Sequence, residues 1–165
     1  MARWVSHAQT WSAVATADTT GIADTNFHLI QGGSGTQRSN ILEVQVGGQA
    51  SSSAISIMLL AGDSTVSTTS WSGANLVALD PATAALAAPP VTGTSTGGTQ
   101  PQRSSTIQFL NLSFNLFGGV VRWVAAPGEE IGMLGASASR GEVSLSAFTG
   151  SGTGAVGSHI VFEPF

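Results

Sequence analysis

Histidine, serine and carboxylate side chains are the groups with which this sequence could perform acid–base or nucleophilic chemistry. The three histidines are His7, His28 and His159, and no two of them stand at a metal-ligand spacing. A Ser-His-Asp triad assembles from distant residues, so spacing alone does not exclude one. The sequence has no G-x-S-x-G motif, however, and His159 between Ser158 and Ile160 has the setting of a strand histidine. We therefore expect no enzymatic activity.

The sequence offers weak signals for a metal or a cofactor. Asp18 and Asp24 form at most a weak oxygen-ligand site, and the Glu129–Glu130 pair is better explained as a solvated or arginine-paired turn. Residues 152–157 match G-x-G-x-x-G, but that motif binds dinucleotides only where a strand leads into a helix. Here a β-like segment follows. We expect a hairpin loop at this place, with no cofactor and no metal.

Arginine is the only basic residue type apart from histidine. Arg38, Arg103 and Arg140 each lie where a loop enters an expected strand, and Arg122 lies within one. A guanidinium group binds a carboxylate or backbone carbonyls through two parallel hydrogen bonds, which suits an interface between subunits. The same geometry also serves contacts within one subunit. Both interpretations of the arginines remain open at this point.

Charge and composition restrict the possible partners. The chain has 165 residues, no cysteine, a net charge of −4 and only 8% charged residues. Nucleic-acid binding depends on clustered lysine and arginine, so we expect no such partner. No apolar run reaches the length of a membrane helix, and the first residues lack the apolar stretch of a signal peptide. The low charge fits a compact β protein with a Ser/Thr/Gly surface, a subunit covered by partners, or both.

Alternating apolar and polar residues predict a chain of short strands. We expect all-β architecture in a single domain, 1–165: an antiparallel β-sandwich, jelly-roll-like, with eight to nine strands. Alternation over 40–47 predicts two faces, one with Ile41, Glu43 and Gln45 and the other with Leu42, Val44 and Val46. The expected strands lie at 3–16, 26–31, 40–47, 54–60, 105–117, 118–135, 142–149 and 158–165.

The segment 118–135 contains the clearest local pattern. Two apolar runs flank Pro127 and Gly128, and this pair is typical of a type II turn, which predicts a β-hairpin. Such a hairpin needs strands on both sides, so we expect it to be a central scaffold. Trp123 is expected to be anchored in the core.

Residues 1–16 are expected to form an N-terminal arm or first strand. Trp4 and Trp11 lie close together near the start of the chain. Two indoles in this position predict docking against an apolar surface. That surface belongs either to a partner or to the protein's own sandwich.

The longest interruption of the strand pattern is the excursion 62–104. It contains one predicted helix, 81–88, because Asp80 is a good N-cap, Pro81 suits the first helical turn and Pro89 ends the run. Long connections in compact domains are often functional. We expect the excursion, with Trp71 in its low-charge flank, to form a contact surface.

Several segments of the chain resemble known proteins. They are FGGVVRWVAAPGEEIGMLG, EVSLSAFTG, SHIVFEPF, PATAALAAPP and GSGTQRSNILEVQVGGQ, and together they span most of residues 30–165. This part of the chain resembles small virion structural proteins of tailed bacteriophages and prophages. The resemblance implies a virion setting, and capsid decoration (cement) proteins commonly use β-sandwich or jelly-roll folds as trimers. It implies no catalytic residues.

The leading hypothesis is a capsid decoration protein, made in the cytoplasm of the bacterial host and bound to the outer capsid surface. Its partners would be the major capsid protein and further copies of this chain in a homotrimer, which together would cross-link capsid subunits. One alternative is a carbohydrate-binding module that stacks sugars on Trp71 or Trp123. Another is a minor tail or head-fibre component. The expected interface residues are Trp4, Trp11, Arg38, Trp71, Arg103 and Arg140.

Overall fold

A computed structural model describes residues 2–17, 21–33, 37–63, 71–84, 86, 90–96, 100–135 and 141–165. Within these ranges the chain forms thirteen strands and no helix. The strands are β1 (Trp4–Ala13), β2 (Phe27–Gln31), β3 (Ser39–Gln49), β4 (Ile55–Asp63), β5 (Trp71–Ser72), β6 (Asn75–Ala78), β7 (Val91–Gly93), β8 (Ser95–Thr96), β9 (Arg103–Asn115), β10 (Phe117–Val124), β11 (Ile131–Met133), β12 (Glu142–Ala147) and β13 (Gly154–Pro164).

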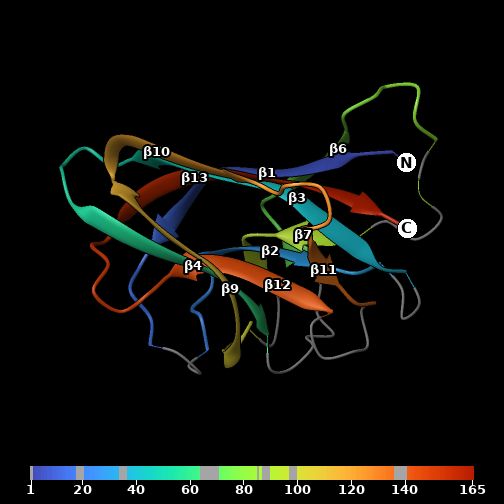
Figure 1. Ribbon diagram of the computed structural model, residues 1–165. Helices are drawn as coiled ribbons and strands as arrows, with labels where there is room; N and C mark the ends of the chain where they lie inside the picture. The colour runs from blue at the N-terminus through green and yellow to red at the C-terminus, as the bar shows by residue number, and fades with distance from the viewer. Residues whose placement is uncertain are drawn as a thin grey trace.

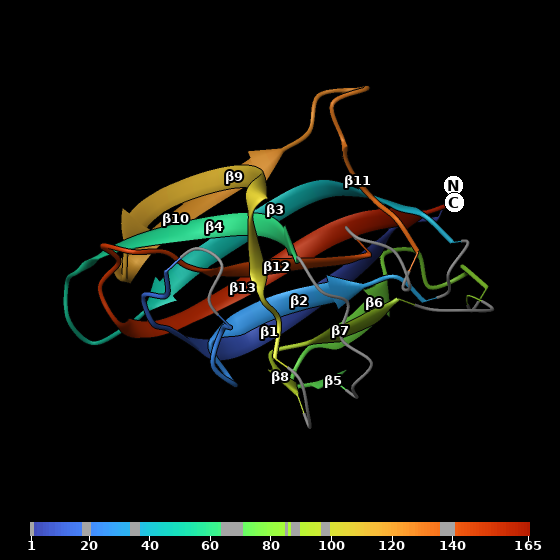
Figure 2. The same ribbon diagram turned by 90° about the horizontal axis from the view of Figure 1, so that it is seen from below.

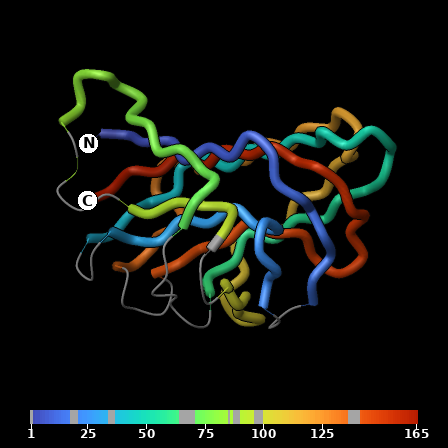
Figure 3. Tube along the Cα trace, turned by 180° about the vertical axis from the view of Figure 1, so that it is seen from behind, coloured from blue at the N-terminus to red at the C-terminus, as the bar shows by residue number. Residues whose placement is uncertain are grey.

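The strands form two antiparallel sheets that pack face to face as a sandwich (Figure 1). One sheet has six strands in the order β10-β3-β13-β1-β6, with β11 also paired to β3. The other has five strands in the order β7-β2-β12-β4-β9, and β5 and β8 form a separate small ribbon. The two ends of the chain lie on the same side of the molecule (Figure 3). The expected all-β sandwich is confirmed, although the described strands are more numerous and several are shorter.

Alternate residues of both sheets fill the space between the layers. Val44 of β3 and Ile160 of β13 pack from one sheet, and Leu60 of β4 and Leu145 of β12 pack from the other. Period-two alternation sends these side chains inward and their neighbours outward. The core therefore draws on every second residue of the long strands.

A β-bulge in β1 brings both N-terminal tryptophans into the core. β1 pairs with β13 in regular register up to Ala8, and the register then shifts before Trp11. A bulge adds one residue to a strand and so exchanges its two faces beyond that point. Trp4 and Trp11 consequently point the same way, and both are buried between the sheets.

A second bulge, in β3, corrects the predicted faces of that strand. Opposite β13, Val161 pairs with Glu43 and Phe162 pairs with Ile41, so Leu42 is the extra residue. Ile41 therefore joins Val44 in the core instead of facing outward with Glu43. Strict alternation could not predict this exchange, because the bulge arises from pairing with a distant strand.

The predicted hairpin at 118–135 is wrong, although its turn is present. Gly128 has φ of 86°, and the Glu129 amide donates to the Ala126 carbonyl at 2.9 Å, as a type II turn requires. However, β10 and β11 do not pair with each other. Both pair with β3, one after the other along the same edge, and residues 125–130 loop outward between them (Figure 2). β10 is thus an edge strand and not the centre of the fold, while Trp123 packs against the core as expected.

The excursion 62–104 begins within β4, contains β5 to β8 and ends in β9, and the predicted helix 81–88 does not form in its described part. Residues 81–84 are turn, with the Asp80 carboxylate accepting from the Ala82 amide at 2.9 Å. Ala85 and residues 87–89 lie outside the described ranges. A helix of two turns is only marginally stable in isolation, and none of the described residues 81–84 and 86 is helical.

Candidate functional site

The outer face of the five-stranded sheet is covered by the protein's own chain. Phe27 and Leu29 point outward from β2 and form a second small core with Ile22, against which Trp71 packs. The rings of Trp71 and Phe27 meet edge to face with centroids 5.7 Å apart. Residues 100–103, which lead into β9, cross this face (Figure 2), and the Pro101 carbonyl accepts from the Ile22 amide at 2.9 Å. Within the excursion, β5 adds Trp71 to this covering layer, whereas β6 and β7 extend the edges of the two sheets.

Arg103, one of the predicted interface residues, is fully buried beneath this layer. Its Nη2 donates to the Thr16 carbonyl at 2.8 Å, and Nη1 donates to the Ala147 carbonyl at 3.4 Å. The guanidinium carbon also lies 5.5 Å from the Phe148 ring centroid. Arg103 therefore ties together three segments of its own subunit, which is the intramolecular alternative left open by the sequence.

Buried carboxyl groups accompany Arg103 at the same end of the sheet. Asp63 stands opposite Arg103 across β4 and β9, and Ser144 donates to Asp63 Oδ1 at 2.9 Å. Burial raises the pKa of Asp63 to about 7, although hydrogen bonding to Ser144 and Glu142 and the charge of Arg103 oppose the shift. Glu142 is also fully buried and accepts from Gln31 Nε2 at 3.2 Å. This cluster is a structural network that stabilises the covered face.

The remaining predicted interface residues lie elsewhere. Arg38 is exposed beside the C-terminal residue, with its guanidinium carbon 5.7 Å from the Phe165 ring centroid. Trp4 and Trp11 are buried in the core of the sandwich, which is where the intramolecular interpretation placed them. Arg140 lies outside the described residues. The five described residues do not converge on one surface.

His28 forms a buried polar network between the two sheets. Its Nε2 lies 2.7 Å from Ser6 Oγ and its Nδ1 lies 2.8 Å from Ser158 Oγ, which also accepts from Trp11 Nε1 at 2.8 Å. Burial lowers the pKa of His28 to about 3, and the nearby His7 and His159 add to the shift. Because both ring nitrogens are engaged within the core, this Ser-His-Ser arrangement is a packing network without access for a substrate.

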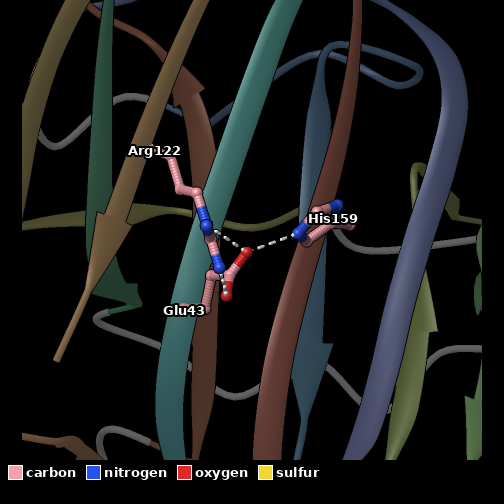
Figure 4. Close-up of polar contacts among 3 residues, drawn as sticks. All are labelled: Glu43, Arg122 and His159. Carbon is pink, nitrogen blue, oxygen red and sulfur yellow. Dashed lines mark hydrogen bonds and ion pairs between the residues drawn. The ribbon is translucent and has the colours of Figure 1, made fainter. Parts of the chain in front are cut away.

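The outer face of the six-stranded sheet presents a different chemistry, which begins with a cluster of three charged or titratable groups. Arg122 of β10 binds Glu43 of β3 through two hydrogen bonds, Nε to Oε1 at 2.8 Å and Nη2 to Oε2 at 2.7 Å. His159 of β13 approaches the same carboxylate, with Nε2 2.9 Å from Oε1 (Figure 4). The Arg122 hydrogen bonds, aided by His159, lower the pKa of Glu43 to about 2.

A row of polar side chains crosses the same face, and we call it the polar row. Cross-strand pairing places Asn75 opposite His7, His7 opposite His159, His159 opposite Gln45, and Gln45 opposite Arg122. The row runs over β6, β1, β13, β3 and β10. Only the antiparallel register of five strands brings these residues together.

A shallow cleft of about 410 Å³ adjoins the polar row. Imidazoles and amides line it, and its floor is backbone at Gly47, Gly48 and Gly157. Gln49 spans this floor, donating from Nε2 to the Gln9 carbonyl at 2.8 Å and accepting from Thr10 at 2.9 Å. A Cβ on Gly157 would lie 2.6 Å from Gln49 Nε2, so glycine there allows Gln49 to reach β1.

A second row, which we call the valine row, lies beside the polar row. Val77, Val5, Val161 and Val124 occupy successive strands, and Glu43 stands between the last two. Val77 is 48% exposed and Val124 is 54% exposed, and Val120 on the same edge strand is 63% exposed. This face therefore combines exposed aliphatic side chains with amides, imidazoles and the paired charges of Glu43 and Arg122.

The arrangement offers hydrogen bonding and apolar contact, and no nucleophile paired with a base is accessible in the described ranges. Among those residues, no group of three or more His, Asp or Glu side chains is placed to hold a metal ion. Nor does that part of the chain contain a helix long and apolar enough to cross a membrane. Residues 154–157 of the G-x-G-x-x-G match already belong to β13, so the expected hairpin loop is shorter than predicted, and a strand rather than a helix follows it. Asp18, half of the weak acidic site, lies outside the described residues.

Sequence reasoning missed the polar row and its ion cluster. Glu43, Arg122 and His159 are separated by 37 or more positions, so no local motif could connect them. Their common signal was an outward position on an alternating strand. Comparison with known proteins adds no assignment: no protein-family model, no curated protein and no solved structure matches this chain.

Proposed function

We propose that this protein is a structural protein of a phage virion, a decoration or cement protein bound to the outer surface of the capsid. In this proposal the chain is made in the cytoplasm of the bacterial host and binds the major capsid protein. The resemblance of several segments to small phage virion proteins motivates the proposal. The contrast between the two outer faces of the sandwich supports it.

The open face of the six-stranded sheet is the observation that carries the proposal. Its valine row exposes aliphatic side chains next to amides, imidazoles and a single arginine that is already paired with Glu43. Stable protein interfaces combine apolar area with satisfied polar groups and are depleted in unpaired charge. A flat sheet face of this composition suits docking onto another protein surface.

We further propose a jelly-roll topology for the sandwich. The eight longest strands are arranged as β1-β13-β3-β10 in one sheet and β2-β12-β4-β9 in the other. In each sheet, strands from the beginning and the end of the chain alternate, as two interleaved Greek keys would place them. Viral capsid and lectin domains use this topology, but fold alone does not define function.

Assembly as a homotrimer completes the proposal. Ile55 is 66% exposed and Phe117 is 63% exposed, and they lie close together because Ile55 pairs with Asn115, whose side chain accepts from the Phe117 amide. Copies in contact through such residues would present several open faces to the capsid at once. Because several copies would then bind the capsid together, their weak individual contacts would give a tight overall affinity.

The test is cosedimentation of the purified protein with capsids assembled from the major capsid protein alone. We expect binding and a higher melting temperature of the capsids. Val124→Asp should weaken binding at least tenfold, because it places an unpaired charge in the valine row. Val91→Asp is the matched control, since Val91 is an exposed valine on β7 of the other sheet. Absence of binding by the wild-type protein, or equal loss in both variants, would refute the proposal.

Carbohydrate binding is the second candidate, and the amide-lined cleft is the feature that favours it. Sugars bind through hydrogen bonds from such groups, usually with an aromatic platform. The aromatic candidates are Trp71 and Trp123, and both are partly buried and engaged in packing. Glycan-array binding that is lost in Gln45→Ala, a substitution in the cleft, would favour this function over capsid docking.

A further inference from the structure

Two histidines face each other at the centre of the open face. His7 of β1 and His159 of β13 are directly paired across the antiparallel ladder and line the same cleft. Side chains in such a pair have Cβ atoms about 4.5–5.5 Å apart. Two imidazole rings at this separation can converge on one ion at the usual metal–nitrogen distance of about 2.0–2.1 Å.

The hydrogen bonding of His159 leaves one ring nitrogen available on the appropriate side. Its Nε2 lies 2.9 Å from Glu43 Oε1, and the other ring nitrogen points away from Glu43 toward β1 (Figure 4). A carboxylate acceptor fixes the proton on Nε2 and leaves the lone pair on Nδ1. Metal-binding histidines usually have such a carboxylate behind them, which orients the ring and increases its basicity.

His7 has the corresponding arrangement on the opposite side of the pair. Its Nε2 lies 3.4 Å from Asn75 Nδ2, the amide nitrogen of a side chain on β6. The oxygen and nitrogen of an asparagine amide exchange places by a flip of the side chain. With the amide oxygen toward His7, Nε2 donates the hydrogen bond and Nδ1 keeps its lone pair. Four adjacent strands then present, in order, Asn75, His7, His159 and Glu43 with the two free nitrogens in the middle.

We propose that His7 and His159 bind one transition-metal ion of the imidazole-preferring class, Zn²⁺, Ni²⁺ or Cu²⁺, through their Nδ1 atoms. The chain supplies only these two side-chain ligands, and water in the open cleft completes the coordination. Glu43 is a positioning residue, because it holds His159 without contacting the ion. Ca²⁺ and Mg²⁺ prefer oxygen ligands and do not suit two imidazoles. This inference does not rest on capsid binding and is tested on the isolated protein.

Isothermal titration of the purified protein with ZnCl₂ and NiCl₂ tests the site. We expect one ion per chain and no binding of MgCl₂ at the same concentrations. His7→Gln and His159→Gln should each weaken binding at least tenfold. Glu43→Gln removes the charge behind His159 and should weaken binding about 10–100-fold. Gln45→Ala is the matched control in the same row and should bind as the wild type does.

Imidazole nitrogen NMR separates metal ligation from nonspecific binding. Addition of Zn²⁺ should shift the Nδ1 signals of His7 and His159. The signals of His28 should stay unchanged, because both of its nitrogens are held by Ser6 and Ser158 in the core. The proposal is wrong if the wild-type protein does not bind Zn²⁺ or Ni²⁺, or if the two His→Gln variants bind as tightly as Gln45→Ala.

Discussion

The two outer faces of this sandwich have opposite relations to the rest of the chain. The outer face of the five-stranded sheet is covered over β2 and β12, and the polar groups there, including Arg103, Asp63 and Glu142, are buried. At the β9 edge of the same sheet, Asn111, Ser113 and Asn115 stay exposed. The outer face of the six-stranded sheet is open, and Arg122 and Val124 on it are exposed. Antiparallel sheets commonly leave one face solvated, and here the six-stranded sheet does so more fully.

The difference explains why similar residues play different parts on the two faces. A buried arginine must satisfy its donors within the protein, so Arg103 binds backbone carbonyls of its own subunit. An exposed arginine exchanges its partner with water at little cost, so the Arg122–Glu43 pair mainly shapes the surface. The covered face therefore contributes to stability, and the open face is the one available to a partner or a ligand.

The largest expected effect comes from the two arginines. Arg103→Met should lower the free energy of unfolding by about 3–5 kcal/mol, because Asp63 loses its counter-charge and two carbonyls lose their donor. Arg122→Met on the open face should cause a far smaller loss. Urea denaturation followed by tryptophan fluorescence measures both. Equal losses in the two variants would contradict the division between a covered and an open face.

The carboxyl groups of the two faces should give opposite pH dependences. The pKa of Asp63 is raised to about 7 in the folded state, so its contribution to stability is complete below its unfolded pKa and is lost as pH rises through 7. The pKa of Glu43 is lowered to about 2, so its contribution is present above its unfolded pKa of about 4.5 and is lost as pH falls toward 2.

The substitution Asp63→Asn isolates the pH dependence that comes from Asp63, since an asparagine mimics the protonated acid. Relative to this variant, the wild-type protein should lose about 2–3 kcal/mol of unfolding free energy between pH 5 and pH 8. The lowered pKa of His28 makes stability fall as pH drops below 6.5. This contribution is the same in both proteins, so it cancels in the comparison. Urea midpoints at the two pH values give the comparison. A constant difference between variant and wild type would show that Asp63 does not titrate in this range.

The smallest effect concerns the apolar residues of the two faces. Trp71→Ala should cost about 1–2 kcal/mol of unfolding free energy, less than a core tryptophan, because the indole is only partly buried against Phe27. Val124→Ala, at an exposed position, should change stability by no more than about 0.5 kcal/mol. Thermal melts of both variants provide the measurement. A Val124→Ala loss as large as that of Trp71→Ala would mean that the open face is packed rather than free.

Local periodicity was sufficient to predict most long strands and the identity of many core residues. Val143 and Leu145 of β12 and Ile160 and Phe162 of β13 lie inward as their alternation indicated. The faces of β1 and β3 were harder to predict, since each contains a bulge. A bulge depends on how two strands far apart in sequence fit together, and it exchanges the faces of every residue beyond it.

The expected interface residues show the same limit of sequence-based prediction. Type and position left two roles open for Trp4, Trp11 and Arg103, an interface or the protein's own fold, and all three are buried within the fold. Tryptophan and arginine are suited to both environments, so composition could not choose between them. The Glu43–Arg122–His159 cluster carried no local motif, because three strands supply one residue each.

The β-rich class, the low charge and the Pro127–Gly128 turn follow from the residues alone, since these depend on side-chain type and local backbone preference. What that turn connects, which face is covered and which residues meet on the open face follow only from the way in which distant strands pack together. Strand pairing is a long-range property: the register of β1, β13 and β3 places His7, His159 and Gln45 in one row, and no local pattern encodes that register.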